Sequence, residues 1–504
     1  MSRFTTLLMR RFRTVRTCWL AGCLCAAAHS GKARFHVLID TDGAADDLRT
    51  ICMLLGNREV EVLSVTASEG ALTPAGAARQ ATALLRHFHH EGIPVGTGRL
   101  LGVPPPAWRS HSEAACWGDT ACLTVSPQQA ADLLVRTIEN EDERVTVVCL
   151  GTLTNLHDAL EGRPELKERI ERVIWYSRSA QPLQGANYDA DPVSAGRVLA
   201  SGIPVRIISA NRQHPLPVDG AYLEAISGIE GEYARHIVRM HGNGAYRPAV
   251  ASGHMQAWDD WTAVYLFAPE LFDSVAVAPA VSAHRPADAP SVARATDAIV
   301  RILTGRPDSE SRVFCGFPED PGLYAGDVAP AVRDAIARHG RSEWRAGVLA
   351  NELHGHLGIY AIVGVKMGIR AREYFNIGVD DIEVTSYAGL QPPVSCLNDG
   401  LQVSTGATLG HGLIRVPTDR DVRPEATFAF KGRTLRLKLK PAYAQQIRRD
   451  VEEGIRLHGN LTEAYWMHVR TLALRYWQTF DRHELFEMQE DGTSGLPVQP
   501  SLME

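Results

Sequence analysis

The sequence predicts an α/β protein with a mostly parallel open sheet, followed by a smaller α+β domain. Three observations predict this fold class. From Phe35 onward, short apolar runs alternate with helix-like segments, which is typical of a parallel sheet with helices on both faces. After about residue 340 the pattern changes to helical segments and then alternating strands. The length of 504 residues exceeds one ordinary core and favours roughly two to four domains.

The first part of the chain supplies the alternating elements. Each predicted strand is a short β-branched or apolar run, and each predicted helix follows the 3.6-residue period. The strands are "FHVLID" (35–40), "VEVLSVTAS" (60–68), "RVTVVCLG" (144–151), "RVIWYS" (172–177) and "PVRIIS" (204–209), and the helices are "DDLRTICMLLGN" (46–57), residues 74–90 and "TNLHDALEG" (154–162).

The second part carries a different pattern. Residues 328–353 are predicted to be helical, residues 426–440 form two alternating strands, and residues 461–488 form an aromatic amphipathic helix. We interpret its Tyr and Trp stripe as core or domain packing. The predicted division is therefore a leader at 1–30, an α/β domain at 31–340 and an α+β domain at 341–504.

The N-terminus has the order of a secretory signal. Basic "MRRFRTVR" precedes apolar "TCWLAGCLCAAA", and small residues follow in "AHS". We expect export to the periplasm or outside the cell, or a cytoplasmic protein if the leader does not function. "LAGC" resembles a lipoprotein box, but the apolar run before Cys23 is short. No stretch reaches the ~20 apolar residues of a membrane span.

Charge and cysteine content exclude several classes of protein. The net charge of −6 and the absence of a long basic run argue against nucleic acid binding. Nine cysteines contain no C-x-x-C pair, which leaves a zinc ribbon unsupported. Cys116 and Cys122 flank a short loop and form either a disulfide in an oxidising compartment or two free thiols. Homo-oligomerisation is compatible with this composition.

Four aspartates stand together in "DTDGAADD", at Asp40, Asp42, Asp46 and Asp47. Asp40 ends the first predicted strand, the place where ligands bind in open α/β sheets. Asp46 and Asp47 fall in the first turn of the next helix, where capping alone accounts for one or two acids. Four carboxylates around one turn indicate a hard divalent cation with oxygen ligands.

Ordered sequence blocks give the first resemblance. "DTDGAADD", "VTVVCLGTLTNLHDAL", "NYDADPVSAGRVLASGIPVRII" and "WDDWTAVYLFAPELF" resemble, in order, the blocks of the inosine/uridine-preferring nucleoside hydrolases across about residues 35–272. The resemblance implies calcium held by Asp40, Asp47, Asp259 and the backbone carbonyl of Leu150. It also implies Asp46 as the general base, in contact with substrate, that takes a proton from a calcium-activated water.

The substrate side of this resemblance is incomplete. Asn187 matches a ribose-contacting asparagine, and Trp258 stands where a histidine often precedes the metal aspartate. Ala71 replaces a second ribose-contacting asparagine, and Gly185 replaces a glutamate. Ala44 replaces the second glycine of the opening motif. The resemblance therefore implies hydrolysis of the N-glycosidic bond of a nucleoside or related N-riboside, with the base and sugar left open.

A second resemblance covers about residues 344–441. "HGHLG" and "CLNDGLQVSTGATLGHG" resemble the family of E-type subunits of formylmethanofuran dehydrogenase, with Gly358 in place of the first cysteine. His354, His356 and Cys396 are ligand types suited to Zn²⁺ or iron. The alternative is a turn that enters a helix, with Cys396 buried as a small hydrophobe.

Two other functions remain open from sequence. In one, the hydrolase domain binds a ribose-like ligand without turnover, as a binding or sensor protein. In the other, the main activity is metal-dependent or redox chemistry in the C-terminal domain.

Overall fold

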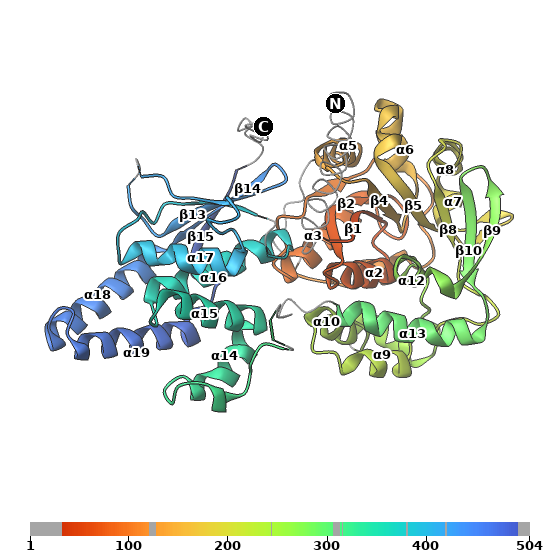
Figure 1. Cartoon of the computed structure of the whole chain (residues 1–504). Coiled ribbons are helices and arrows are strands. Elements are labelled where there is room, and N and C mark those ends of the chain that lie inside the picture. The colour runs from red at the N-terminus through yellow and green to blue at the C-terminus, as the bar shows by residue number, and fades with distance from the viewer. Residues whose placement is uncertain are drawn as a thin grey trace, which may run out of the picture.

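The chain folds into two lobes that lie side by side (Figure 1). The computed structural model describes residues 33–119, 128–242, 244–305, 313–314, 316–379, 382–418 and 421–491. The predicted leader and Cys122 lie outside these residues. Within them, no helix combines the length and the apolar character that a membrane crossing requires.

The N-terminal lobe is built on an eight-stranded sheet with the order β3-β2-β1-β4-β5-β8-β10-β9. Every neighbouring pair is parallel except β10 and β9. The strands are β1 (Phe35–Thr41), β2 (Val60–Ala67), β3 (Val95–Thr97), β4 (Val145–Cys149), β5 (Ile170–Tyr176), β8 (Val205–Ile208), β9 (Phe272–Ala278) and β10 (Val281–Pro286), with a separate hairpin of β6 (Ser179–Ala180) and β7 (Leu183–Gln184). The predicted mostly parallel open sheet is confirmed.

Helices cover both faces of this sheet (Figure 1). They are α2 (Ala45–Leu55), α3 (Pro74–His87), α4 (Arg109–Ala114), α5 (Ala130–Asn140), α6 (Thr154–Gly162), α7 (Ala186–Ala190), α8 (Pro192–Leu199), α9 (Gly220–Ser227), α10 (Glu232–Gly242), α11 (Arg247–Ala251), α12 (Asp260–Phe267) and α13 (Ala289–Thr304), with 3₁₀ turns at Pro164–Arg169, Gly244–Tyr246 and Pro269–Leu271. β1 is buried at all seven positions, because a central parallel strand has helices above and below it.

The C-terminal lobe is α+β, as predicted. A five-stranded sheet of order β12-β11-β13-β14-β15 packs with a group of helices. Its strands are β11 (Glu383–Ser386), β12 (Ile414–Arg415), β13 (Glu425–Phe430), β14 (Arg433–Leu439) and β15 (Phe486–Asp491), and its helices are α14 (Val332–His339), α15 (Arg341–His354), α16 (Ile359–Phe375), α17 (Leu397–Thr405), α18 (Pro441–His458) and α19 (Glu463–Thr479), with 3₁₀ turns at Pro321–Leu323, Ala329–Ala331 and Val394–Cys396.

Glycine allows the central helices α16 and α17 to touch. A Cβ on Gly364 would lie 2.2 Å from the Leu397 carbonyl oxygen, and a Cβ on Gly400 would lie 2.1 Å from the Ala361 carbonyl oxygen. These distances are far below van der Waals contact, so both positions need glycine for the backbones to approach.

One feature of the C-terminal lobe differs from the sequence prediction. The last helix ends at Thr479, and Phe486–Asp491 forms the edge strand β15 against β14. The segment "FEMQED" alternates with period two, and Phe486 is buried in the core, so strand pairing wins over continuation of the helix. The hydrophobic core of this lobe includes Val328 and, from α14, Val332 and Ala335.

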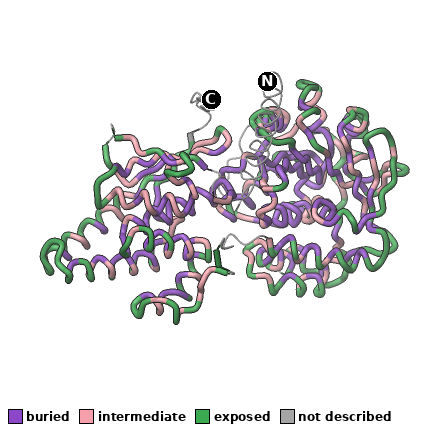
Figure 2. The backbone as a smooth tube through the Cα atoms, viewed as in Figure 1, coloured by how far each residue is buried: buried purple, intermediate pink, exposed green. Residues whose placement is uncertain are grey.

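Buried residues concentrate in the interior of each lobe (Figure 2). Hydrogen bonds also join the lobes: the Gly92 amide donates to the Tyr374 carbonyl at 2.9 Å, and the Asn376 side chain donates to the Leu55 carbonyl at 3.2 Å. The N-terminal site described next lies at the carboxyl ends of the parallel strands.

Candidate active site and metal centres

The turn after β1 sets the direction of the aspartates. Gly43 adopts a positive φ of 82°, and α2 starts at Ala45, so Asp46 and Asp47 occupy its first turn as predicted. Ala44 has an ordinary φ of −67°. The left-handed residue of this turn is therefore Gly43, and alanine in place of the family's glycine at position 44 causes no strain.

Three carboxylates converge beside this turn. One oxygen each from Asp46, Asp47 and Asp259 lie within 4.8 Å of one another. Asp47 is held by the Thr41 hydroxyl at 2.6 Å and the Asp42 amide at 2.9 Å, both on Oδ2. Its Oδ1 and the Oδ1 of Asp259 are buried and have no hydrogen-bond donor among the described residues.

The electrostatics of this trio call for a cation. Burial raises the pKa of Asp47 and Asp259 well above the usual range, and neighbouring carboxylates raise both pKa values further. Burial also raises the pKa of Asp46, although the Arg49 charge opposes the shift. A hard divalent ion stabilises buried carboxylates whose oxygens lack hydrogen-bond donors, so the residues fit an ion of this kind.

Asp40 is placed differently from the trio. Its Oδ1 accepts from Ser68 Oγ at 2.6 Å, and its Oδ2 accepts from Thr66 Oγ1 at 2.6 Å and Asn155 Nδ2 at 2.7 Å. Burial raises the pKa of Asp40 to about 6, against the effect of these hydrogen bonds. The structure thus brings together Asp46, Asp47 and Asp259, while Asp40 is already held by three donors.

Asp42 belongs to the same electrostatic group. Burial, together with the charges of Asp46 and Asp40, raises the pKa of its carboxyl to about 7. A Cβ on Gly70 would lie 2.1 Å from Asp42 Oδ2, and a Cβ on Gly151 would lie 3.3 Å from Asp42 Cβ. Two glycines therefore make room for this side chain.

The Leu150 carbonyl, predicted to bind the metal, is in contact with Asn187, predicted to contact the ribose. The Asn187 side chain donates from Nδ2 to the Leu150 carbonyl at 2.6 Å and to the Tyr176 carbonyl at 3.3 Å. Asn187 is buried, and Leu150 follows directly on β4. The structure therefore brings the Leu150 and Asn187 segments together at the same edge of the sheet.

One departure from the family pattern, Gly185, has a local structural reason. Gly185 has a φ of 139°, and a Cβ there would lie 2.8 Å from the Arg178 amide nitrogen, so a glutamate does not fit this backbone. The Ala71 carbonyl accepts from Arg109 Nε at 3.2 Å. Trp258 is 39% exposed beside Asp259, which leaves its indole available for stacking.

The partners that position the acids were not predicted. Thr66, Ser68 and Asn155 hold Asp40, and Thr41 holds Asp47. A sequence signal existed, because these polar residues stand at the ends of predicted buried strands or start the next helix. In an open α/β sheet those positions converge on one edge.

The predicted C-terminal metal residues lie at the end of α15 and the start of α17. His354 Nδ1 contacts Asp399 Oδ2 at 2.7 Å, and His354 Nε2 is buried without a hydrogen-bond partner among the described residues. The rings of His354 and His356 are 4.3 Å apart. A histidine oriented by a carboxylate with the other nitrogen bare is the arrangement seen at metal-binding histidines. His354 therefore has the surroundings of a metal-binding histidine.

Gly358 lies against His354, and Cys396 lies near Asp399. A Cβ on Gly358 would lie 2.8 Å from His354 Nε2, so the glycine that replaces the family's cysteine leaves room for the imidazole. Burial and the charge of Asp399 raise the pKa of the Cys396 thiol. Within the part of the chain that the structure describes, this region holds no group of three ligand atoms as close as the Asp46 trio.

A second cluster of acidic side chains is neutralised by a lysine rather than by a metal ion. His36, Glu61 and Glu141 form the other cluster of ligand atoms among the described residues. Lys431 of the C-terminal lobe places Nζ 2.5 Å from Glu61 Oε1 and 2.6 Å from Glu141 Oε2. The lysine ammonium supplies the compensating charge, so this cluster is an ion-pair contact between the lobes.

Comparison with known proteins agrees with this architecture. Residues 37–311 match the inosine-uridine preferring nucleoside hydrolase family, and residues 353–487 match the FmdE family of the molybdenum formylmethanofuran dehydrogenase operon. The pyrimidine-specific ribonucleoside hydrolases RihA of Salmonella paratyphi A and Klebsiella pneumoniae are 27% and 28% identical over 257 residues. Each alignment covers 47% of this chain and 81% of the relative.

A solved structure, the purine-preferring ribonucleoside hydrolase from Gardnerella vaginalis, is 18% identical with a TM-score of 0.44, over 53% of this chain and 99% of that one. The family match spans more than half of the 504 residues. The chain therefore belongs to the inosine-uridine preferring nucleoside hydrolase family and is an N-glycosyl hydrolase, and its residues 353–487 are similar to the FmdE family.

Proposed function

We propose that the chain hydrolyses the N-glycosidic bond of a nucleoside or related N-riboside in a calcium-dependent reaction. The observation that supports this most strongly is the convergence of Asp46, Asp47 and Asp259, with two buried carboxylate oxygens lacking donors among the described residues. Asp47 and Asp259 would hold the ion, together with the Leu150 carbonyl and one carboxylate of the first strand. When bound, the cation supplies positive charge that lowers the pKa of a nearby water.

Asp46 is the proposed general base. It is only half-buried, whereas Asp47 and Asp259 are buried, so Asp46 is the member of the trio that a substrate can reach. Burial raises its pKa, which strengthens it as a proton acceptor. Asp46 would take a proton from the attacking water, while the nearby carboxylates favour positive charge developing on the ribose ring.

The proposed substrate contacts are Asn187, Asp46 and Trp258. Asn187 lies beside the Leu150 carbonyl, and the exposed Trp258 offers an aromatic face to a base. Pyrimidine nucleosides come first among candidate substrates, because the curated relatives named above are described as pyrimidine-specific.

The test is a nucleoside screen with the full chain, starting with uridine and cytidine, with added Ca²⁺ or with a chelator. We expect calcium-dependent release of free base. Asp46→Asn should lower kcat by roughly 10²–10⁴-fold, the usual contribution of a general base. Asp273→Asn, an exposed aspartate on β9, is the matched control and should keep full activity. Absence of calcium-dependent cleavage, or full activity in Asp46→Asn, would contradict the proposal.

A binding or sensor role is the second candidate. The backbone at Gly185 excludes a side chain, which removes a functional group from the site. This role predicts that Ca²⁺ and ribose together raise the melting temperature while no nucleoside yields product.

A transition metal in the C-terminal domain is the third candidate. His354 Nε2, His356 and Cys396 would bind Zn²⁺ or iron, and the bare, buried Nε2 supports it. Elemental analysis of freshly purified protein tests this, and a metal content near zero would count against both the site and a redox role.

Export and self-association stay proposals. Determining the N-terminal residue of the protein recovered from periplasm or medium tests cleavage near residue 30. Light scattering coupled to gel filtration tests homo-oligomerisation.

A further inference from the structure

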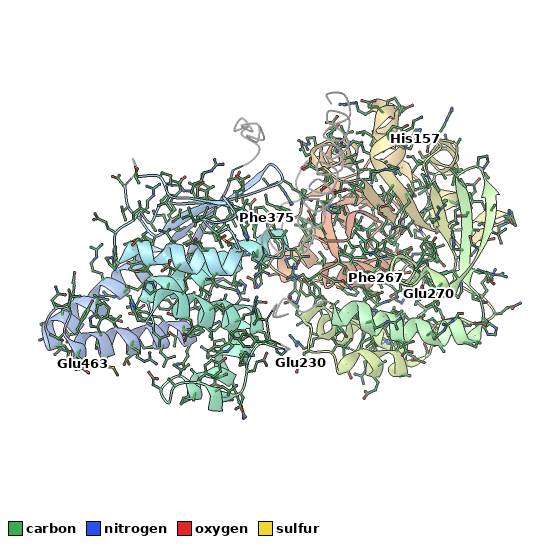
Figure 3. All side chains as sticks on the ribbon, viewed as in Figure 1. His157, Glu230, Phe267, Glu270, Phe375 and Glu463 are labelled. Carbon is green, nitrogen blue, oxygen red and sulfur yellow. The ribbon has the colours of Figure 1, made fainter. Side chains whose placement is uncertain are left out.

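A large cavity lies between the two lobes. Its volume is about 990 Å³, and its walls come from both domains. The N-terminal lobe supplies the end of α2, the segment after α3 and the start of α10. The C-terminal lobe supplies α14, the start of α15, part of α16 and the residues after α19. Figure 3 labels Glu230 where the lobes face each other. Cavities at domain boundaries are common ligand sites, and this volume suits a nucleotide-sized molecule.

The wall of this cavity carries an excess of positive charge. Seven arginines line it against four glutamates: Arg58, Arg235, Arg333, Arg338, Arg341, Arg372 and Arg482, with Glu230, Glu232, Glu319 and Glu373. Three of the glutamates already form ion pairs with arginines. Arg341 pairs with Glu230 and Glu319, and Arg482 pairs with Glu373 at 2.5 Å. With seven arginines against four glutamates, the charge of the wall is positive overall.

Two of these arginines are available to a ligand. Arg333 is exposed on α14 and makes no hydrogen bond or ion pair with any residue that the structure describes. Arg338, further along the same helix, is also exposed, and its Nη1 reaches only the Gln478 carbonyl at 3.4 Å. Guanidinium groups recognise phosphate with paired N–H donors, which a carboxylate-free arginine can offer in full.

The N-termini of two helices add to the positive electrostatic potential of the cavity. The first residues of α10 and α15 both line the cavity, and the N-cap of α15 is Gly340, which has no side chain to cap the helix. The positive ends of two helix dipoles therefore point toward the arginine-lined space. The rings of His89 and His483, one from each lobe, stack on the wall with their centroids 3.7 Å apart and form a contact between the lobes.

We propose that this cavity binds a phosphorylated small molecule, separate from the nucleoside site, with Arg333 and Arg338 among its phosphate ligands. Because the walls come from both lobes, such a ligand would bind the docked arrangement and stabilise it. The site does not depend on the calcium-dependent activity, since none of its lining residues belongs to the aspartate cluster.

The experiment uses the full chain with inorganic pyrophosphate as the probe. Binding is measured by calorimetry and by the shift of melting temperature, with sodium chloride added to equalise ionic strength. We expect saturable binding that raises the melting temperature. The double variant Arg333→Gln/Arg338→Gln should bind pyrophosphate at least roughly tenfold more weakly, since each lost guanidinium removes charge-assisted hydrogen bonds.

The matched control is Arg197→Gln/Arg415→Gln, two exposed arginines outside the cavity. It should bind like the unchanged chain, and nucleoside hydrolysis should be equal in all three proteins. The single variant Arg333→Gln gives a second reading if the double variant unfolds at a lower temperature without ligand.

Three results would overturn the proposal. One is the absence of saturable pyrophosphate binding by the unchanged chain. Another is equal weakening in the cavity variant and the control variant. The third is tighter binding of citrate than of pyrophosphate, which would assign the arginines to a carboxylate ligand instead.

Discussion

Arg49 and Asp260 form a bidentate ion pair that is completely buried beside the aspartate cluster. Arg49 Nε lies 2.9 Å from Asp260 Oδ1, and Arg49 Nη2 lies 2.7 Å from Asp260 Oδ2. The pair ties α2, which carries Asp46 and Asp47, to α12, which follows Asp259. It therefore fixes the relative position of the two elements that supply the trio, and the Arg49 charge acts to lower the pKa of Asp46, against the larger effect of burial.

Replacing Arg49 by methionine should strongly destabilise the chain. The change leaves the Asp260 carboxylate buried without its counter-charge, which typically costs ~3–5 kcal/mol. Denaturation in urea measures the loss. Arg197→Met, at an exposed position on α8, should change stability by no more than about 0.5 kcal/mol. A double variant Arg49→Met/Asp260→Leu should recover much of the loss, and failure to do so would show that the pair itself is not the cause.

The first strand and the residue directly after it offer two candidate calcium ligands, Asp40 and Asp42. Asp40 accepts hydrogen bonds from Thr66, Ser68 and Asn155, whereas Asp42 has a raised pKa of about 7 after burial beside other acids. If Asp40 coordinates the ion as the family resemblance implies, Asp40→Asn should abolish the calcium-dependent rise in melting temperature.

If Asp40 only stabilises the surrounding structure without binding the ion, Asp42→Asn should abolish the calcium-dependent rise instead. Asp40→Asn should then keep that rise but start from a lower melting temperature without calcium. Isothermal calorimetry with CaCl₂ on both variants separates the two cases. Unchanged calcium affinity in both variants would exclude both aspartates as calcium ligands.

The candidate metal site of the C-terminal lobe can be tested by substituting Gly358. Its substitution by alanine places a Cβ 2.8 Å from His354 Nε2, so the imidazole must move away from Asp399. Transition metal content should fall in Gly358→Ala and in His354→Asn. Gly162→Ala, where a Cβ meets nothing within 4 Å, is the matched control and should retain the metal. Equal metal content in all variants would place the metal elsewhere.

The contact between the lobes should depend on pH. Burial raises the pKa of Glu141, but His36 and Lys431 outweigh that effect and hold it at about 2, below the ordinary 4.5. Its contribution to stability is complete above pH 4.5 and is lost as the pH falls toward 2. Burial lowers the pKa of His36, but Glu141 and Glu61 raise it above 6.5 overall, so its contribution is complete below pH 6.5 and is lost at higher pH.

The cluster should therefore stabilise the chain most between about pH 4.5 and 6.5. The measurement is the melting temperature of the unchanged chain minus that of Glu141→Gln, followed across this range and beyond both ends of it. Glu168→Gln, at an exposed glutamate, should show a flat difference. A difference for Glu141→Gln that is equally flat would show that the cluster does not contribute to the pH dependence of stability.

The periodicity of the sequence predicted most of the N-terminal fold. The apolar runs at 35–40, 60–68 and 144–151 became β1, β2 and β4, because β-branched runs bounded by turns have few other solutions. The position of Asp46 and Asp47 in the first turn of α2 also followed from local pattern. The C-terminal end of the chain was harder: the segment "FEMQED" became β15 because the free edge of β14 offered it a partner.

By itself, the sequence determined the elements, their order and the residues rich in chemistry, because helix and strand periods and turn residues are local properties. The tertiary structure alone decided which of those residues meet. It brought Asp259 to Asp46 and Asp47 while tying Asp40 to Asn155, and it set an arginine-lined cavity between the lobes. These outcomes depend on long-range packing and on the cost of burying unpaired charge, which no local pattern records.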